Sequence, residues 1–164
     1  MAWSAIIWGG FVATTLGVAC AWIFRAFGWT EVSPAAQVGS LFFRNPRLPI
    51  TEGAGLLTLF VFGCSVIPAI YYLIMQAAGG FSAPGGALVG LLHGMGAVGA
   101  LPFSGRFNAS VRAGRLPPPG QLGLAWGWGT PVAILVGHIV YGAVLGATLD
   151  AFTEPPVFVL PVPE

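Results

Sequence analysis

Long apolar runs alternate with short polar connections along this chain of 164 residues. A helix that crosses a bilayer needs about 20 mostly apolar residues, and four runs satisfy this length: residues 2–24, 53–78, 83–101 and 130–149. Ser82 and Thr130 are expected to cap the third and fourth helices, each just before a proline that suits a first turn. Pro102 is expected to end the third helix. The pattern predicts an all-α integral membrane protein with four transmembrane helices.

The two long connections and the C-terminal tail have patterns of their own. Ser33 and Pro34 predict the start of a short helix that runs to Phe43. In the third connection, apolar residues recur every four positions beside arginines, at Phe103, Phe107 and Val111. We therefore expect an amphipathic, interfacial helix in each long connection. The tail, residues 150–164, is rich in proline and is predicted to be extended. No internal repeat divides the chain, so residues 1–164 are expected to form one domain.

The positive charges indicate how the bundle is oriented. All six basic residues are arginines, and all lie in the first and third connections: Arg25, Arg44, Arg47, Arg106, Arg112 and Arg115. The second connection has no basic residue, and the tail carries only acids. Loops that stay in the cytoplasm are enriched in Lys and Arg. We therefore expect a bacterial inner-membrane protein with both termini outside the cytoplasm.

Composition excludes several classes of function. Only 7% of the residues are charged and the mean hydropathy is +0.86, whereas soluble domains carry about 25% charged residues. A net charge of +1 leaves no basic surface for nucleic acid. Glu52 and Asp150 fall at opposite membrane faces, so no carboxylate pair, catalytic residue or metal site is predicted. Cys20 and Cys64 lie at different depths and are expected to stay unpaired. The chain is not expected to be an enzyme.

Glycines mark the faces along which the helices are expected to pack. They recur at four-residue spacing in the third and fourth segments, at Gly86, Gly90, Gly94, Gly142 and Gly146. In lipid, such small residues let helix backbones approach closely, and the partner helix can belong to this chain or to another. Pro68 in the second segment removes a hydrogen bond to the Cys64 carbonyl and predicts a kink there.

Two histidines are the ionisable side chains inside the spanning segments. His93 and His138 both fall near the middle of antiparallel helices, so their imidazoles are expected at one depth. The pair could ligate one b-type haem, or each imidazole could hold one chlorophyll-type pigment. Alternatively, each neutral ring donates to a carbonyl or to Tyr141 and stabilises helix packing. A histidine pair without arginines placed for haem propionates favours this packing role over a cofactor.

The fourth segment contains the sequence His138-Ile139-Val140-Tyr141-Gly142-Ala143-Val144-Leu145-Gly146. It resembles the closing signature of an uncharacterised family of small four-helix bacterial membrane proteins. Residues 10–15 and 90–94 are similar to other helices of that family. The resemblance implies the four-helix layout and carries no activity with it. The long first connection and the proline-rich tail have no counterpart in it.

These patterns favour a non-catalytic accessory or assembly subunit of a larger membrane complex, with a respiratory or photosynthetic electron-transfer complex as the expected host. Its partners would be other integral membrane subunits and lipids. A haem- or pigment-binding protein that uses His93 and His138 is the alternative. A small channel or transporter with its pathway near Pro68 is a further one.

Overall fold

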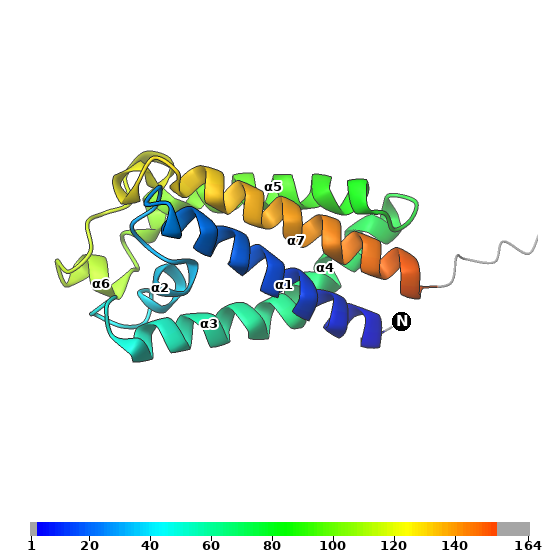
Figure 1. Ribbon diagram of the computed structural model, residues 1–164, viewed down its shortest axis with the longest axis horizontal. Coiled ribbons are helices and arrows are strands. Elements are labelled where there is room, and N and C mark those ends of the chain that lie inside the picture. The colour runs from blue at the N-terminus through cyan, green and yellow to red at the C-terminus, as the bar shows by residue number, and fades with distance from the viewer. Residues whose placement is uncertain (1–2, 154–164) are drawn as a thin grey trace, which may run out of the picture.

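The computed structural model describes residues 3–153, and this part of the chain consists of helices and turns without a strand. Figure 1 shows long helices packed side by side, with the short helices gathered at one end. The elements are α1 (Trp3–Ala26), α2 (Pro34–Gly39), α3 (Pro49–Cys64), α4 (Val66–Ala77), α5 (Ala83–Ser104), α6 (Ala109–Arg112), the 3-10 helix η1 (Gln121–Trp126) and α7 (Thr130–Phe152). The proline-rich tail beyond Thr153 lies outside the described residues, and its predicted extended form stays a prediction.

Four helical segments are long and apolar enough to cross a membrane: Trp3–Ala26, Pro49–Ala77, Ala83–Arg112 and Thr130–Phe152. Large apolar side chains point outward along them, and Trp8, Leu57 and Leu92 are each more than 60% exposed. Such an outer surface suits hydrocarbon rather than water. The predicted number of spanning segments and the all-α class therefore hold, and the chain is compatible with a multi-pass membrane protein.

Two ends of the bundle are distinguished below. The connection end carries the long segments 27–48 and 105–129, and the terminal end carries residues 3 and 153 with the short connection 78–82 (Figure 1). All six arginines belong to the connection end, and Arg25 lies in the last turn of α1.

Helix boundaries differ from those predicted in all four segments, and α1 continues through Arg25 to Ala26. The second segment begins at Pro49 rather than Gly53, because Pro49 starts the first turn and Glu52 lies inside it. The third continues through Pro102 to Ser104, because a proline removes only one helical hydrogen bond. The Ser104 hydroxyl donates to the Leu101 carbonyl over 2.7 Å and closes this last turn. The fourth helix continues past Asp150 to Phe152.

The kink predicted from Pro68 is present as a break at Ser65, which divides the second segment into α3 and α4. Ser65 has φ −125° and ψ −80°, outside helical values. Pro68 is fully buried and has no N–H for the Cys64 carbonyl. On the facing helix α1, a side chain at Gly10 would overlap the Gly63 carbonyl and Pro68. The break therefore lies where α1 crosses this segment at backbone contact.

The first connection does not form the interfacial helix predicted for residues 33–43. Ser33 caps α2 as expected, accepting a hydrogen bond from the Ala36 N–H over 3.0 Å, but α2 ends at Gly39. Ala35 and Gly39 are buried, because α2 packs on α3, where a side chain at Gly39 would overlap the Thr51 carbonyl. The helix therefore contributes to the protein interior, and its predicted place at the membrane interface stays a prediction.

The third connection is irregular, and α6 is its one short α-helix rather than a continuous amphipathic one. It folds back over the bundle, where the Trp126 indole is 1% exposed and donates to the Pro117 carbonyl over 2.8 Å. Thr130 is not the predicted cap of α7. Its hydroxyl donates to the Trp126 carbonyl over 3.1 Å and lies 2.9 Å from that of Thr30. Both long connections are thereby joined at the start of α7.

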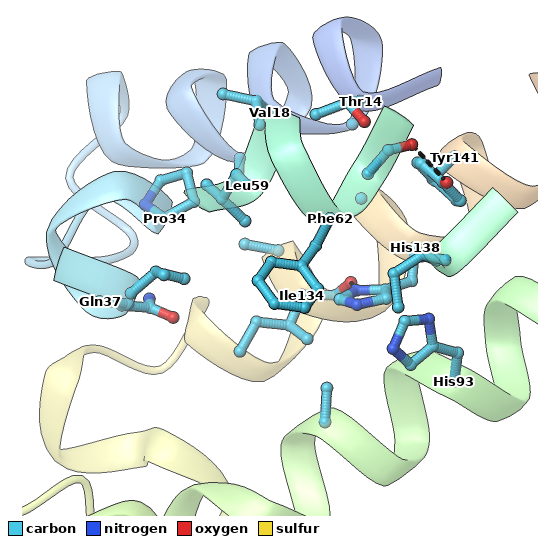
Figure 2. Close-up of a pocket in the computed structure, with 18 of the residues that line it drawn as sticks. Thr14, Val18, Pro34, Gln37, Leu59, Phe62, His93, Ile134, His138 and Tyr141 are labelled. Atoms are coloured by element: carbon cyan, nitrogen blue, oxygen red, sulfur yellow. Dashed lines mark hydrogen bonds between the residues drawn. The ribbon is translucent and has the colours of Figure 1, made fainter. Parts of the chain in front are cut away.

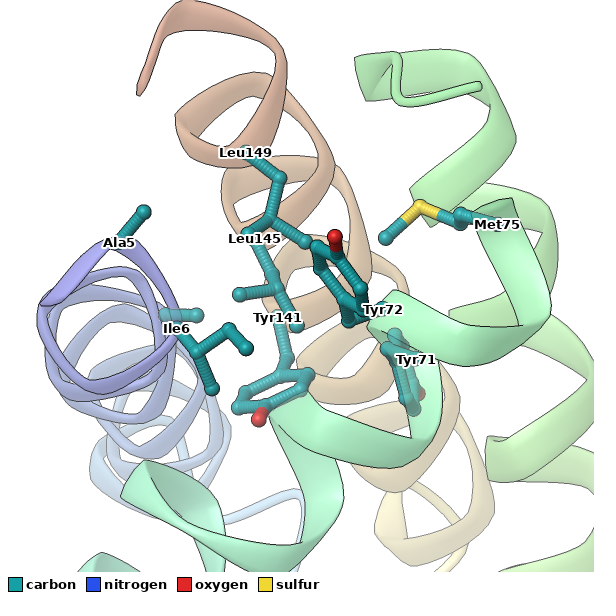
Figure 3. Packing of buried hydrophobic residues seen from close by; sticks show 9 residues of the cluster. Ala5, Ile6, Tyr71, Tyr72, Met75, Tyr141, Leu145 and Leu149 are labelled. Atoms are coloured by element: carbon teal, nitrogen blue, oxygen red, sulfur yellow. The ribbon is translucent and has the colours of Figure 1, made fainter. Parts of the chain in front are cut away.

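The terminal end is filled by a tightly packed apolar core between α1, α4 and α7 (Figure 3). Leu145 and Leu149 are fully buried, and Tyr71 and Met75 are each 2% exposed. The bend at Ser65 turns the start of α4 toward this core. This core closes the space between α1, α4 and α7 at the terminal end, while a second pocket lies there between α4 and the start of α5.

Helices α5 and α7 lie side by side (Figure 1), and all five glycines of the predicted packing faces lie at their contact. A side chain at Gly86 would overlap the Gly142 carbonyl, and one at Gly142 would overlap the Gly86 carbonyl. One at Gly90 would overlap the carbonyl of His138. The partner of the α5 glycine face is therefore a helix of the same chain.

Gly142→Ala is expected to destabilise the bundle by about 2 kcal/mol or more, because the new methyl group meets a backbone carbonyl that cannot move aside. Gly96→Ala on α5 is the matched control. Nothing lies within 4 Å of a side chain there, so the better helix propensity of alanine leaves stability unchanged or raises it by up to about 1 kcal/mol. SDS-titrated unfolding followed by circular dichroism measures both. Equal losses of stability would contradict the assigned contact.

Candidate functional site

The connection half of the bundle contains a cavity of about 410 Å³. Figure 2 shows its walls, which come from α1, α2, α3, α5 and α7 and are mainly apolar. Val18, Pro34, Leu59, Phe62 and Ile134 are among the residues that line it. Pockets of about 300–1,000 Å³ with apolar walls and a few polar groups are typical of small-molecule sites. The cavity is the strongest candidate for a binding site in the described part of the chain.

The two predicted histidines meet at the mid-depth end of this cavity. His93 comes from α5 and His138 from α7, and their ring centroids are 4.6 Å apart at an interplanar angle of 83°. Both rings line the cavity (Figure 2). Their contact follows from the glycine packing, since Gly94 lies against the Cβ of His138. The expectation that the two imidazoles lie at one depth agrees with this geometry.

Each imidazole is held through its Nδ1 atom. Nδ1 of His138 lies 2.7 Å from the Ile134 carbonyl one turn earlier in α7. Nδ1 of His93 lies 3.0 Å from the Tyr71 hydroxyl, which α4 brings across from the other side. The expected partner Tyr141 does not bond either histidine. Its hydroxyl donates to the Gly63 carbonyl over 2.9 Å, near the end of α3.

The hydrogen bond from Tyr141 to the Gly63 carbonyl is possible because the helix breaks just after Gly63. The last carbonyls of a helix have no partner within it, and Gly63 is the residue before the last in α3. Tyr141 is 8% exposed and its ring packs edge-on against Tyr71. Tyr71 and Tyr141 thus form a buried polar layer between the apolar core of the terminal end and the cavity.

The opposite end of the cavity lies at the connection end, near the charged groups. Nη1 of Arg25 lies 3.3 Å from Oε1 of Glu52, and the Ser33 hydroxyl donates to the same oxygen over 3.1 Å. Gln37, which lines the cavity, donates to the Val32 carbonyl over 3.3 Å. This pair of charges joins α1 to α3 with side chains that are more than a third exposed. Charge is thus confined to the rim, and the described cavity wall carries none.

One buried polar atom of the wall has no partner. The Thr14 hydroxyl oxygen makes no hydrogen bond within residues 3–153, although the residue is 5% exposed. It lies against the backbone of Gly63, where a side chain would overlap it. The close approach of α1 to α3 at this level leaves the hydroxyl enclosed.

The histidine pair does not fit a haem shared between the two rings. If both imidazoles were axial ligands, the metal would lie between them, and each ligating nitrogen would be about 2 Å from it. The plane of the macrocycle would also have to fit between the two rings. Rings that contact each other edge to face leave no space for that plane. Among the described residues, no group of three or more His, Cys, Asp or Glu side chains is placed to hold a metal ion. Cys20 and Cys64 are both free.

Sequence reasoning located the two histidines but missed Tyr71. A tyrosine in an apolar helix has no local pattern that names its partner, and His93 is 22 residues away along the chain. The available signal was Pro68, which lies three residues before Tyr71 in α4.

Comparison with models of known protein families, with curated proteins and with solved structures finds no match to this chain. The resemblance drawn from residues 138–146 therefore stays a prediction.

Proposed function

We propose that this protein is a non-catalytic, multi-pass membrane protein that binds a lipophilic small molecule inside its helix bundle. The observation that carries this proposal is the apolar cavity of about 410 Å³ that ends on the two imidazoles. Its size and its apolar walls with a few polar groups are those of small-molecule sites.

The chemistry of the wall supports an uncharged, apolar ligand. Val18, Leu59 and Phe62 offer dispersion contacts, and no acid or arginine lines the cavity. An ionised ligand would be buried there without a counter-charge, which is unfavourable in a site of low dielectric constant. The polar groups concentrate at the histidine end, where they can orient one polar head.

Ala97→Phe is expected to abolish ligand retention, because Ala97 lines the cavity and a benzyl side chain would occupy it. Ala100→Phe is the matched control, one turn away on α5 and exposed outside the cavity. The measurement is solvent extraction and mass spectrometry of small molecules that co-purify with each variant. The wild type and Ala100→Phe should carry close to one molecule per chain, and Ala97→Phe less than about a tenth of that. Equal amounts in all three would contradict the proposal.

A second candidate function, an accessory subunit of a larger membrane complex, is favoured by the outer face of α5. A side chain at Gly96 or Gly99 would have nothing within 4 Å, so these glycines are not used by this bundle, and small residues permit close helix approach. We propose a respiratory or photosynthetic electron-transfer complex as the host, because such assemblies contain small helical subunits; this step is one of analogy.

Native gel electrophoresis in mild detergent tests the accessory role on protein from its own membrane. The wild type should migrate with a larger complex, and the double variant Gly96→Leu with Gly99→Leu should be released from it. Gly53→Leu on α3 is the control, since that glycine is equally open and lies on another helix. Migration of the wild type as a lone monomer would exclude this role.

We also propose that the connection end faces the cytoplasm of a bacterial cell and that both termini lie outside, because all six arginines gather at that end. After Cys20 and Cys64 are replaced by alanine, single cysteines are placed at Phe42, which is 63% exposed, and at Ala78. A membrane-impermeant maleimide should label Ala78→Cys in intact cells and Phe42→Cys only after lysis. The reverse pattern would invert the proposed topology.

A further inference from the structure

The two histidines each leave one ring nitrogen free. Neither Nε2 atom has a hydrogen-bond partner among residues 3–153, since the bonds of both rings go through Nδ1. In that part of the chain, the Thr14 hydroxyl is the one buried polar side-chain atom without a partner. The Nε2 atoms are therefore accessible, and both rings line the cavity. The cavity thus offers two unpaired nitrogens at its mid-depth end.

The hydrogen bond to Ile134 decides which nitrogen of His138 carries the proton. A carbonyl oxygen can only accept, so Nδ1 of His138 must donate to it. Neither imidazole faces a carboxylate, because the described acids, Glu31, Glu52 and Asp150, lie at the ends of the bundle. A charged ring without a counter-charge is unfavourable inside a membrane, so His138 is neutral. Its Nε2 is consequently a hydrogen-bond acceptor.

The Tyr71 hydroxyl decides the same question for His93. Tyr71 is 2% exposed, and the Nδ1 atom of His93 is its one hydrogen-bond partner among residues 3–153. If the hydroxyl accepted from His93, its own hydrogen would be buried without a partner, which is costly. Tyr71 therefore donates to Nδ1, and the neutral His93 ring carries its proton on Nε2. His93 thus offers a donor where His138 offers an acceptor.

We propose that this donor and acceptor pair recognises the hydroxyl group of an apolar alcohol or phenol, which deepens the proposed ligand-binding function and rests on it. The hydroxyl donates its hydrogen to Nε2 of His138 and accepts from Nε2–H of His93. Both rings line the cavity and their centroids are 4.6 Å apart, and the proposal requires that one hydroxyl reach both Nε2 atoms. The hydrocarbon part of the ligand extends along Phe62 and Val18 toward the connection end.

Other ligands satisfy this site less well. A water molecule suits both nitrogens, but its share of liquid volume is about 30 Å³, and it makes no use of the apolar wall of a cavity of about 410 Å³. A ketone or an ether can accept from His93 but has no hydrogen for His138. A carboxylate would lack a cation, because Arg25 is paired with Glu52 at the rim. A hydroxyl is the simplest group that is complementary to both rings.

Three matched probes test the inference: 4-nonylphenol, its methyl ether 4-nonylanisole, and nonylbenzene. They are added at equal mole fractions to micelles that contain the full chain, and native mass spectrometry counts the bound molecules. Nonylphenol should bind about tenfold more tightly than the other two, because it alone satisfies both rings. In His138→Ala this preference should fall below about twofold, while nonylbenzene binds as before.

The outcomes separate the hydroxyl inference from the proposed function. If all three probes bind equally and Ala97→Phe abolishes their binding, the hydroxyl inference is overturned and the cavity function stands. If no probe binds, or if binding ignores Ala97→Phe, both are overturned. A preference for nonylphenol that survives in His138→Ala also overturns the inference.

Nitrogen-15 NMR of histidine-labelled wild-type protein in bilayers gives a test that needs no variant. His138 should carry its proton on Nδ1 and His93 on Nε2. Nonylphenol should shift the Nε2 signals of both rings, and nonylbenzene should leave them in place. A His93 ring protonated on Nδ1, or Nε2 signals that do not respond to nonylphenol, would overturn the proposed recognition.

Discussion

The backbone contact between α5 and α7 is the interaction on which the rest of the structure depends. In a bilayer, apolar side chains gain no hydrophobic free energy by exchanging lipid contacts for contacts with one another. The helices are therefore held together by close packing and by a few polar bonds. Gly86 and Gly142 approach so closely that neither could carry a side chain, and Gly90 lies against the His138 carbonyl. This register determines the depth of one histidine relative to the other. A shift by one turn along the contact would separate the imidazoles and remove the donor and acceptor pair.

The break at Ser65 gives the bundle two unlike halves. A straight second segment would be one rod, whereas the break lets α4 pack Tyr71 and Met75 into the core (Figure 3) while α3 pairs with α2. It also frees the Gly63 carbonyl, which Tyr141 satisfies. The apolar core of α1, α4 and α7 therefore lies on one side of the two tyrosines, and the cavity lies on the other (Figure 2).

This division has a functional consequence. The apolar core at the terminal end holds the two tyrosines in place, and the Tyr71 hydroxyl bonds to one of the imidazoles. Preorganised polar groups at the end of an apolar space can select a ligand by its polar head, while the apolar wall contributes affinity. Charges at the rim, Arg25 and Glu52, stay where water and lipid headgroups can solvate them. The cavity wall therefore carries no charged side chain but still presents polar groups at its histidine end.

The sequence by itself determined what depends on neighbours along the chain: four apolar segments of spanning length, the caps at Ser33 and Ser82, a break near Pro68, and two histidines near mid-depth. Only the tertiary structure decided which surfaces meet. The docking of α2 on α3, the hydrogen bond from Tyr71 to His93, the true role of Thr130 and the cavity all join residues distant in sequence. The spacing of residues shows which face of a helix carries apolar or small side chains, but in lipid several such faces could serve equally well as packing surfaces. The choice among them is made by backbone fit, which no local pattern encodes.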